Sequence, residues 1–264
     1  MNASKQTSPN LTTQTQRTPK PVIRVALCFL ALTLPTIASA VECQDQSHDG
    51  RSFTVCTVDA TTEDLRLFLR SGDGTVLGQF RDLERSLSAG ETLSFAMNAG
   101  MYHADRRPVG HYVEKNIEET RLLTGASSGN FGLLPNGVFC ITNTTAQVYE
   151  TLDFASKSPQ CRDASQSGPM LVIDGQLHPR FLPNSTSKFL RNGVGTTANG
   201  ETAHFVISKG PVTFHQFGSF FRDVLNTPNA LYFDGKVSRL HAPQLERSDA
   251  GFWMGPIVGV IDHN

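Results

Sequence analysis

Residues 94–116, SFAMNAGMYHADRRPVGHYVEKN, pass from an apolar run to a series of polar and charged side chains. Asn98 directly follows the apolar run, Gly100 permits a sharp change of direction, and Arg106 supplies a positive charge. The stretch is longer than a usual hairpin loop. It is typical of a ligand-binding loop, because the strand before it is a rigid support. The alternative for Asn98 is a left-handed turn position.

Three further polar runs follow predicted strands: QSGPM at 166–170, KFLRNGVG at 188–195 and FDGKVSRL at 233–240. Each contains glycine beside polar side chains, which lets a backbone approach a ligand closely. Polar runs at strand ends build one site when the sheet brings those ends together. The sequence therefore predicts a pocket whose walls come from distant parts of the chain.

Two charged residues in these runs, Arg191 and Asp234, could act at such a site. An arginine can hold a phosphate through two parallel N–H donors. A carboxylate can activate a water molecule. Both have plainer alternatives: Asp234-Gly235 also suits a hairpin turn, and an exposed arginine often forms only a surface ion pair. Asp174-Gly175 has the same dipeptide, and there we expect a turn.

The elements that must position these residues are mostly strands. The sequence pattern predicts a short helix over 81–90, ended by Gly90, and strands at 52–58, 64–70, 75–80, 92–97, 110–115, 136–142, 146–150, 169–173, 176–178, 195–198, 201–208, 229–235 and 255–262. Many strands and few helices indicate an α+β fold. We expect a single domain built on a mixed, strand-rich sheet with a few packed helices.

A second helix is predicted over 213–226. Phe214, Phe217 and Phe221 fall on one face at helical spacing. Thr213, with Gln216 three residues later, matches a capping box. This helix directly precedes the predicted strand at 229–235, which leads to Asp234.

Three motifs in order, MNAGMY at 97–102, RNGVG at 191–195 and LYFDGKVS at 231–238, resemble the phosphodiester glycosidase family. N-acetylglucosamine-1-phosphodiester α-N-acetylglucosaminidase belongs to that family, and this chain is similar to a bacterial branch of it. The resemblance covers residues 90–262, approximately. The chain departs from the family pattern at Ala99, at Asn192-Gly193 and at Lys236-Val237, where the family has Gly, Thr-Ala and two further Gly residues.

The resemblance implies a hydrolase that cleaves the sugar–phosphate bond of a sugar 1-phosphodiester, with no cofactor and no metal. It implies Asn98, Arg191 and Asp234 as catalytic residues. With the loop arguments above, the expected substrate-binding residues are Gly100, Arg106, Gly195, Gly235 and Ser238. One alternative is a binding module that holds a phosphorylated glycan without cleaving it, favoured by the missing glycines of the last motif. The other is a metal-dependent phosphodiesterase, which the lack of a metal-ligand motif disfavours.

The first 40 residues have the order of a secretory signal peptide. Four basic residues and no acidic one precede an apolar run, Val25 to Leu34, and Ala38-Ser39-Ala40 offers a cleavage site. A buried helix or an uncleaved anchor is the alternative, although the apolar run is short for a membrane span. We therefore expect a signal peptide at 1–40, a glycosidase-like domain at 41–264, a secreted or periplasmic location and no stable membrane anchor.

Charge and cysteine content fit an exported protein, and a carbohydrate phosphodiester as substrate is what the resemblance implies. Residues 41–264 contain 19 basic and 24 acidic side chains, a net charge of −5, which argues against a nucleic-acid partner. Four cysteines remain in this part and suggest two disulfides. Three pairings are possible. We favour Cys43–Cys56 and Cys140–Cys161 because each closes a short loop, and no spacing suggests zinc.

Overall fold

The computed structural model describes residues 8–10, 41–235 and 237–263. The predicted signal peptide lies outside the described residues except at 8–10, and Lys236 is outside them as well. Residues Ser39–Asn264 group as one compact unit. None of the helices in the described ranges is long and apolar enough to cross a membrane.

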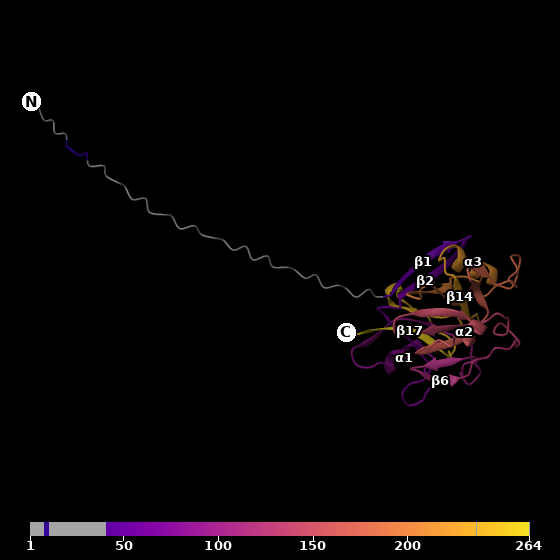
Figure 1. The fold of residues 1–264 in the computed structure, drawn as a ribbon. Coiled ribbons are helices and arrows are strands. Elements are labelled where there is room, and N and C mark those ends of the chain that lie inside the picture. Colours follow the sequence, from indigo (N-terminus) through magenta and orange to yellow (C-terminus); the bar gives the residue numbers. More distant parts are fainter. Residues whose placement is uncertain (1–7, 11–40, 236, 264) are drawn as a thin grey trace, which may run out of the picture. The chain divides into compact units, whose positions relative to one another are not determined.

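The chain forms mainly strands, joined by short helices (Figure 1). The strands are β1 (Glu42–His48), β2 (Arg51–Asp59), β3 (Asp64–Phe68), β4 (Glu91–Asn98), β5 (Tyr112–Glu114), β6 (Ile117–Thr120), β7 (Gly137–Ile141), β8 (Ala146–Glu150), β9 (Asp163–Ser167), β10 (Met170–Ile173), β11 (Gln176–Leu177), β12 (Asn192–Thr196), β13 (Thr202–Ser208), β14 (Asn229–Asp234), β15 (Leu240–Ala242), β16 (Arg247–Ser248) and β17 (Ile257–His263). The helices are α1 (Phe80–Ser86), α2 (Thr151–Lys157), α3 (Phe214–Asp223) and a 3₁₀ turn, η1 (Pro243–Leu245).

These strands build three sheets of antiparallel pairs within the described residues. The first has the order β1-β2-β13-β12-β14-β10-β11, the second β16-β15-β4-β17-β3 and the third β6-β5-β9-β7-β8. The predicted α+β class, with many strands and few helices, is confirmed. The strands are distributed over several sheets, so residues that end strands in different sheets can face one another.

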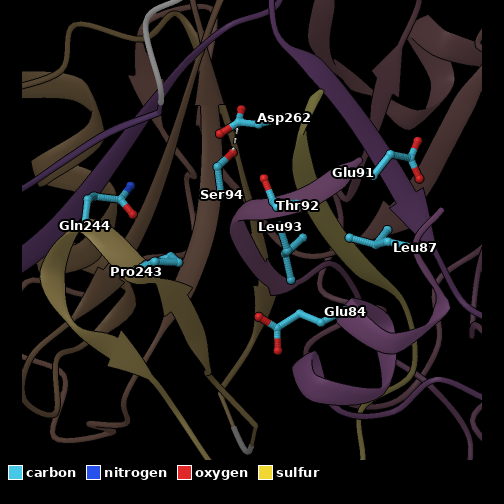
Figure 2. Close-up of a pocket in the computed structure, with 9 residues that line it drawn as sticks. All are labelled: Glu84, Leu87, Glu91, Thr92, Leu93, Ser94, Pro243, Gln244 and Asp262. Carbon is cyan, nitrogen blue, oxygen red and sulfur yellow. Dashed lines mark hydrogen bonds between the residues drawn. The ribbon is translucent and has the colours of Figure 1, made fainter. Parts of the chain in front are cut away.

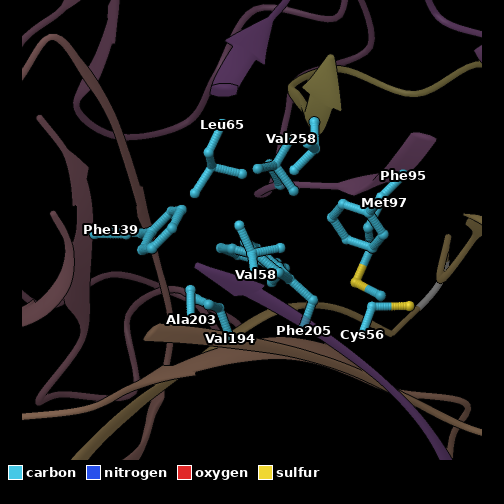
Figure 3. Close-up of a cluster of buried hydrophobic side chains, with 14 of the residues drawn as sticks. Cys56, Val58, Leu65, Phe95, Met97, Phe139, Val194, Ala203, Phe205 and Val258 are labelled. Carbon is cyan, nitrogen blue, oxygen red and sulfur yellow. The ribbon is translucent and has the colours of Figure 1, made fainter. Parts of the chain in front are cut away.

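The main hydrophobic core joins side chains from all three sheets (Figure 3). Phe205 of β13 contacts Phe95 of β4 at 4.9 Å between ring centres and Phe139 of β7 at 5.7 Å. Val58 of β2 and Val258 of β17 are buried in the same cluster. Burial of this apolar surface holds the sheets together and fixes the ends of their strands.

Helix α3 confirms the prediction made from its sequence. The Thr213 side chain accepts from the Gln216 backbone, and the Gln216 side chain accepts in return from the Thr213 backbone, which completes the capping box. Phe217 and Phe221 are buried, and the helix packs on β10 and β11. It therefore covers the seven-stranded sheet beside β14.

Several local predictions are wrong. Residues 75–80 form no strand; only Arg70 and Val76 make an isolated bridge, and β3 pairs instead with β17. The first helix ends at Ser86, before Gly90. Elements β1, β6, β9, β15, β16 and α2 were not predicted, and β12 begins inside a run interpreted as a loop. Strand β9, DASQS, shows the reason: it is buried but polar, so it lacks an apolar pattern.

Both expected disulfides are present. Cys43 pairs with Cys56 between β1 and β2, and Cys140 of β7 pairs with Cys161. We expect oxidised protein comprising residues 41–264 to show no alkylation of thiols before reduction and four alkylated cysteines after it. Intact-mass measurement with iodoacetamide checks this, and a labelled thiol in unreduced, folded protein would contradict the pairing.

Candidate functional site

Two buried asparagines join the second sheet to the first. Asn98 ends β4, and Asn192 begins β12. The Asn98 amide nitrogen donates to Asn192 Oδ1 at 3.2 Å, and the Asn192 amide nitrogen donates to Asn98 Oδ1 at 3.0 Å and to the Asn98 carbonyl at 2.9 Å. Both side chains are fully buried, so the pair satisfies groups that would otherwise lack partners. Asn98 is therefore a link between sheets and not a left-handed turn residue.

The same pair holds the chain on both sides of Asp234. The Asp234 backbone N–H donates to Asn192 Oδ1 at 3.2 Å. The Arg239 backbone N–H donates to Asn98 Oδ1 at 2.9 Å. Between them, the Ser238 hydroxyl donates to the Asp234 carbonyl at 2.9 Å. All three sequence motifs thus meet in one hydrogen-bond network, which fixes where β14 ends.

Asp234 lies where two cavities share residues. The smaller cavity, here the aromatic pocket, has a volume of about 200 Å³ and is lined by Met101, Asn130, Phe189, Tyr232, Asp234 and Gly235. The larger, here the loop pocket, has a volume of about 430 Å³ and is lined by Met101, Tyr102, Val109, Ser127, Ser128, Gly129, Asn130, Phe131, Asp234 and Val237. Met101, Asn130 and Asp234 belong to both. A ligand with two parts can therefore occupy both cavities with Asp234 at the junction.

The electrostatic influence of Asp234 reaches the tyrosines of both pockets. Burial raises the pKa of Tyr102 in the loop pocket, and the charge of Asp234 adds to that rise. Burial also raises the pKa of Tyr232 well above its ordinary value; Arg191 opposes the rise and Asp234 adds to it. Both phenols are therefore protonated at neutral pH and can donate hydrogen bonds.

Arg191 lies behind the wall of the aromatic pocket and is only 1 % exposed. Its guanidinium carbon is 3.6 Å from the centre of the Phe214 ring. Nε donates to the Val212 carbonyl at 2.9 Å, and Nη2 donates to the Ser187 carbonyl at 3.3 Å. These bonds occupy the Nε–Nη2 edge and leave the Nη1–Nη2 edge, so the expected contact with phosphate through two donors stays a prediction. The alternative of a surface ion pair is wrong, because the side chain is buried.

At two of the predicted glycines, a side chain would clash with a neighbouring group. A Cβ on Gly235 would lie 2.1 Å from the Tyr232 hydroxyl, so only glycine lets that hydroxyl reach the end of β14. Gly100 has φ +151°, and a Cβ there would lie 2.8 Å from Ser165 Oγ. Gly195 is different, because it packs beneath α3: a Cβ there would lie 2.7 Å from Phe221. Its predicted role in substrate binding is replaced by a packing role.

Ser238 and Arg106 lie at the margins of the site. Ser238 does not line either pocket; it contributes to a separate cavity of about 480 Å³ that also contains Lys209 and Arg247. The Arg106 guanidinium carbon lies 5.3 Å from the ring centre of Tyr102, which lines the loop pocket. Arg106 is thus next to the loop pocket, whereas Ser238 acts on the backbone of Asp234.

Sequence reasoning did not single out Asn192, Tyr232 or Asn130 as site residues. Asn192 was visible as a departure from the family motif, and its pairing with Asn98 now explains why an amide suits that position. Tyr232 stands two residues before Asp234, so its side chain shares a face of β14 with that carboxylate. Asn130 belongs to a loop without a motif, and nothing local marks it.

Another cavity lies at the opposite end of β4 (Figure 2). It has a volume of about 540 Å³, and its lining includes Glu84, Glu91 and Asp262. Three carboxylates disfavour an anionic ligand there. Within the described ranges, no group of three or more His, Cys, Asp and Glu side chains is arranged to hold a metal ion, and these three carboxylates are no exception.

This strand-rich α+β domain has an aspartate at the junction of two cavities, one of them beside a buried arginine. A sequence model described as phosphodiester glycosidase matches residues 91–241, which include Asn98, Asn192 and Asp234. The chain belongs to the phosphodiester glycosidase family. It is accordingly a hydrolase of the class that acts on glycosyl bonds.

Similarity to other proteins extends over most of the chain. A protein of Escherichia coli (strain K12), "Uncharacterized protein YigE", is 32% identical over 214 residues, which are 81% of this chain and 84% of the relative. The catalytic domain of zebrafish N-acetylglucosamine-1-phosphodiester α-N-acetylglucosaminidase superposes with a TM-score of 0.60 at 12% identity, over 87% of this chain and 85% of the other. A hypothetical protein from Synechocystis superposes with a TM-score of 0.53 at 13% identity, over 84% of this chain and 61% of the other. These two structures are similar in fold.

Proposed function

We propose that this protein is exported and hydrolyses the bond between the anomeric carbon and the phosphate of a sugar 1-phosphodiester in envelope or extracellular glycans. The observation that carries the proposal is the position of Asp234, at the junction of two cavities that differ in size and lining. The two disulfides are consistent with an oxidising compartment.

The proposed step needs one carboxylate at the anomeric carbon. A water oxygen forms a bond to that carbon, the carbon–oxygen bond to phosphate breaks, and its electron pair stays on the departing phosphate monoester. The water proton passes to the Asp234 carboxylate, which also stabilises positive charge at the ring. Phosphate is a good leaving group, so a strong general acid is less necessary than for an ordinary glycoside.

The neighbouring residues have supporting roles in this proposal. Asn98 positions Asp234 through Asn192. Gly100 and Gly235 allow close approach of the backbone, and the positive charge of Arg106 beside Tyr102 favours an anionic substrate. Arg191 supplies a buried positive charge beside the aromatic pocket.

A screen of defined sugar 1-phosphodiesters tests the proposal. Purified protein of residues 41–264 is expected to release free sugar and a phosphate monoester at equal rates, with unchanged turnover in EDTA. Release of a sugar phosphate instead would place the cleavage at the phosphorus atom and contradict the proposed bond. Turnover abolished by EDTA and restored by a divalent metal would favour the phosphodiesterase alternative. Saturable binding without product would favour the binding module.

A further inference from the structure

The buried Arg191 charge has unusual surroundings. The guanidinium donates to two backbone carbonyls and interacts with the Tyr232 side chain, and within the described residues Nη1 is buried without a hydrogen bond of regular geometry. Burial lowers the pKa of Arg191, and Tyr232 is the neighbour that opposes this. Arg239 is buried too, but it has the opposite charge of Asp249 nearby. A buried cation without a carboxylate is costly, and an anion bound close to it would offset that cost.

Tyr232 connects this charge to the aromatic pocket. Its ring packs edge-on against Phe214 at 4.8 Å between centres, and the guanidinium carbon of Arg191 is 5.4 Å from its ring centre. Only 1 % of the residue is exposed, yet it forms part of the pocket wall. Its hydroxyl lies against Gly235, next to Asp234. The phenol is thus a hydrogen-bond donor between the buried cation and the pocket.

We infer that the aromatic pocket is the phosphate subsite, and that Tyr232 binds a phosphate oxygen through its hydroxyl while Arg191 acts through Tyr232 as a positioning residue. The inference rests on the proposed function for the identity of the substrate. A volume of about 200 Å³ suits a phosphate group, and the loop pocket of about 430 Å³ leaves room for the sugar. Asp234 then lies beside the bond that joins the two groups. Phe189, which is half exposed, lines this pocket as well.

The test is the affinity for inorganic phosphate, measured by titration calorimetry on wild-type protein and on Tyr232→Phe. Phenylalanine keeps the ring packing and removes only the hydroxyl. We expect phosphate binding about tenfold or more weaker in Tyr232→Phe, because a hydrogen bond to a charged group is lost. Tyr149→Phe is the matched control: its hydroxyl donates to Gln147 Oε1, away from both pockets, and phosphate affinity should be unchanged.

Arg191 variants test the indirect part of the inference. Arg191→Lys keeps the charge and should retain more phosphate affinity than Arg191→Met, with KM for a sugar 1-phosphodiester rising more than kcat falls. Equal phosphate affinity in wild-type and Tyr232→Phe protein would overturn the inference, as would loss of binding in Tyr149→Phe alone. Tyrosine-dependent phosphate binding without turnover of any sugar 1-phosphodiester would overturn the proposed function and leave the subsite intact.

Discussion

Asp234→Asn is expected to lower turnover of a sugar 1-phosphodiester on the order of 10³-fold, the usual scale for loss of a positioned acid–base group. The substitution removes the charge and keeps the shape. Asp234 Oδ1 accepts from the Gly235 backbone N–H at 2.6 Å, and an asparagine oxygen can accept the same bond. The free energy of unfolding should therefore change by no more than about 0.5 kcal/mol. Steady-state kinetics and urea denaturation measure the two effects.

The chain contains a matched control for this substitution. Asp174-Gly175 has the same dipeptide in the turn between β10 and β11, where Asp174 is exposed and has φ +47°. Asparagine tolerates that conformation, so Asp174→Asn should keep wild-type turnover. Wild-type turnover in Asp234→Asn as well would show that Asp234 is only a turn residue.

Asn98→Ala is expected to lower both stability and turnover. It leaves the Arg239 backbone N–H without its acceptor, whereas the Asn192 amide nitrogen loses one acceptor and keeps the Asn98 carbonyl. A buried unsatisfied group costs roughly 1–3 kcal/mol, and we expect a loss of this size in the free energy of unfolding. Turnover should fall about 100-fold, because Asn192 then no longer holds the Asp234 backbone in place.

A double-mutant cycle separates this role from general destabilisation. Asn98→Ala and Asn192→Ala should be strongly non-additive, since each removes the partner of the other. Leu67→Ala, a truncation in the fully buried core, provides a comparable stability loss of roughly 2–5 kcal/mol without touching this network. If Leu67→Ala lowers turnover as much as Asn98→Ala at a temperature where both are folded, Asn98 has no specific positioning role.

The sequence by itself determined the features that depend on neighbours a few residues apart. The capping box of α3 joins residues three positions apart, and the apolar runs of β4 and β14 mark strands within a short window. The two disulfides close loops with separations of 13 and 21 residues, which made their pairing the simplest choice. The ordered motifs also indicated the family, because a family signature consists of residue types along the chain.

Only the tertiary structure decided which polar groups satisfy one another. Asn98 contacts Asn192 because the last residue of β4 and the first residue of β12, in different sheets, lie next to each other. The sequence near either residue does not predict this contact. Arg191 was expected to reach the ligand. Its side chain is buried against Phe214 of α3 and donates to the Val212 carbonyl just before that helix. Buried hydrogen bonds and charges depend on sheet register and packing across long separations. Residue types therefore revealed the chemistry present at the site, and the fold determined which side chains can contact a substrate.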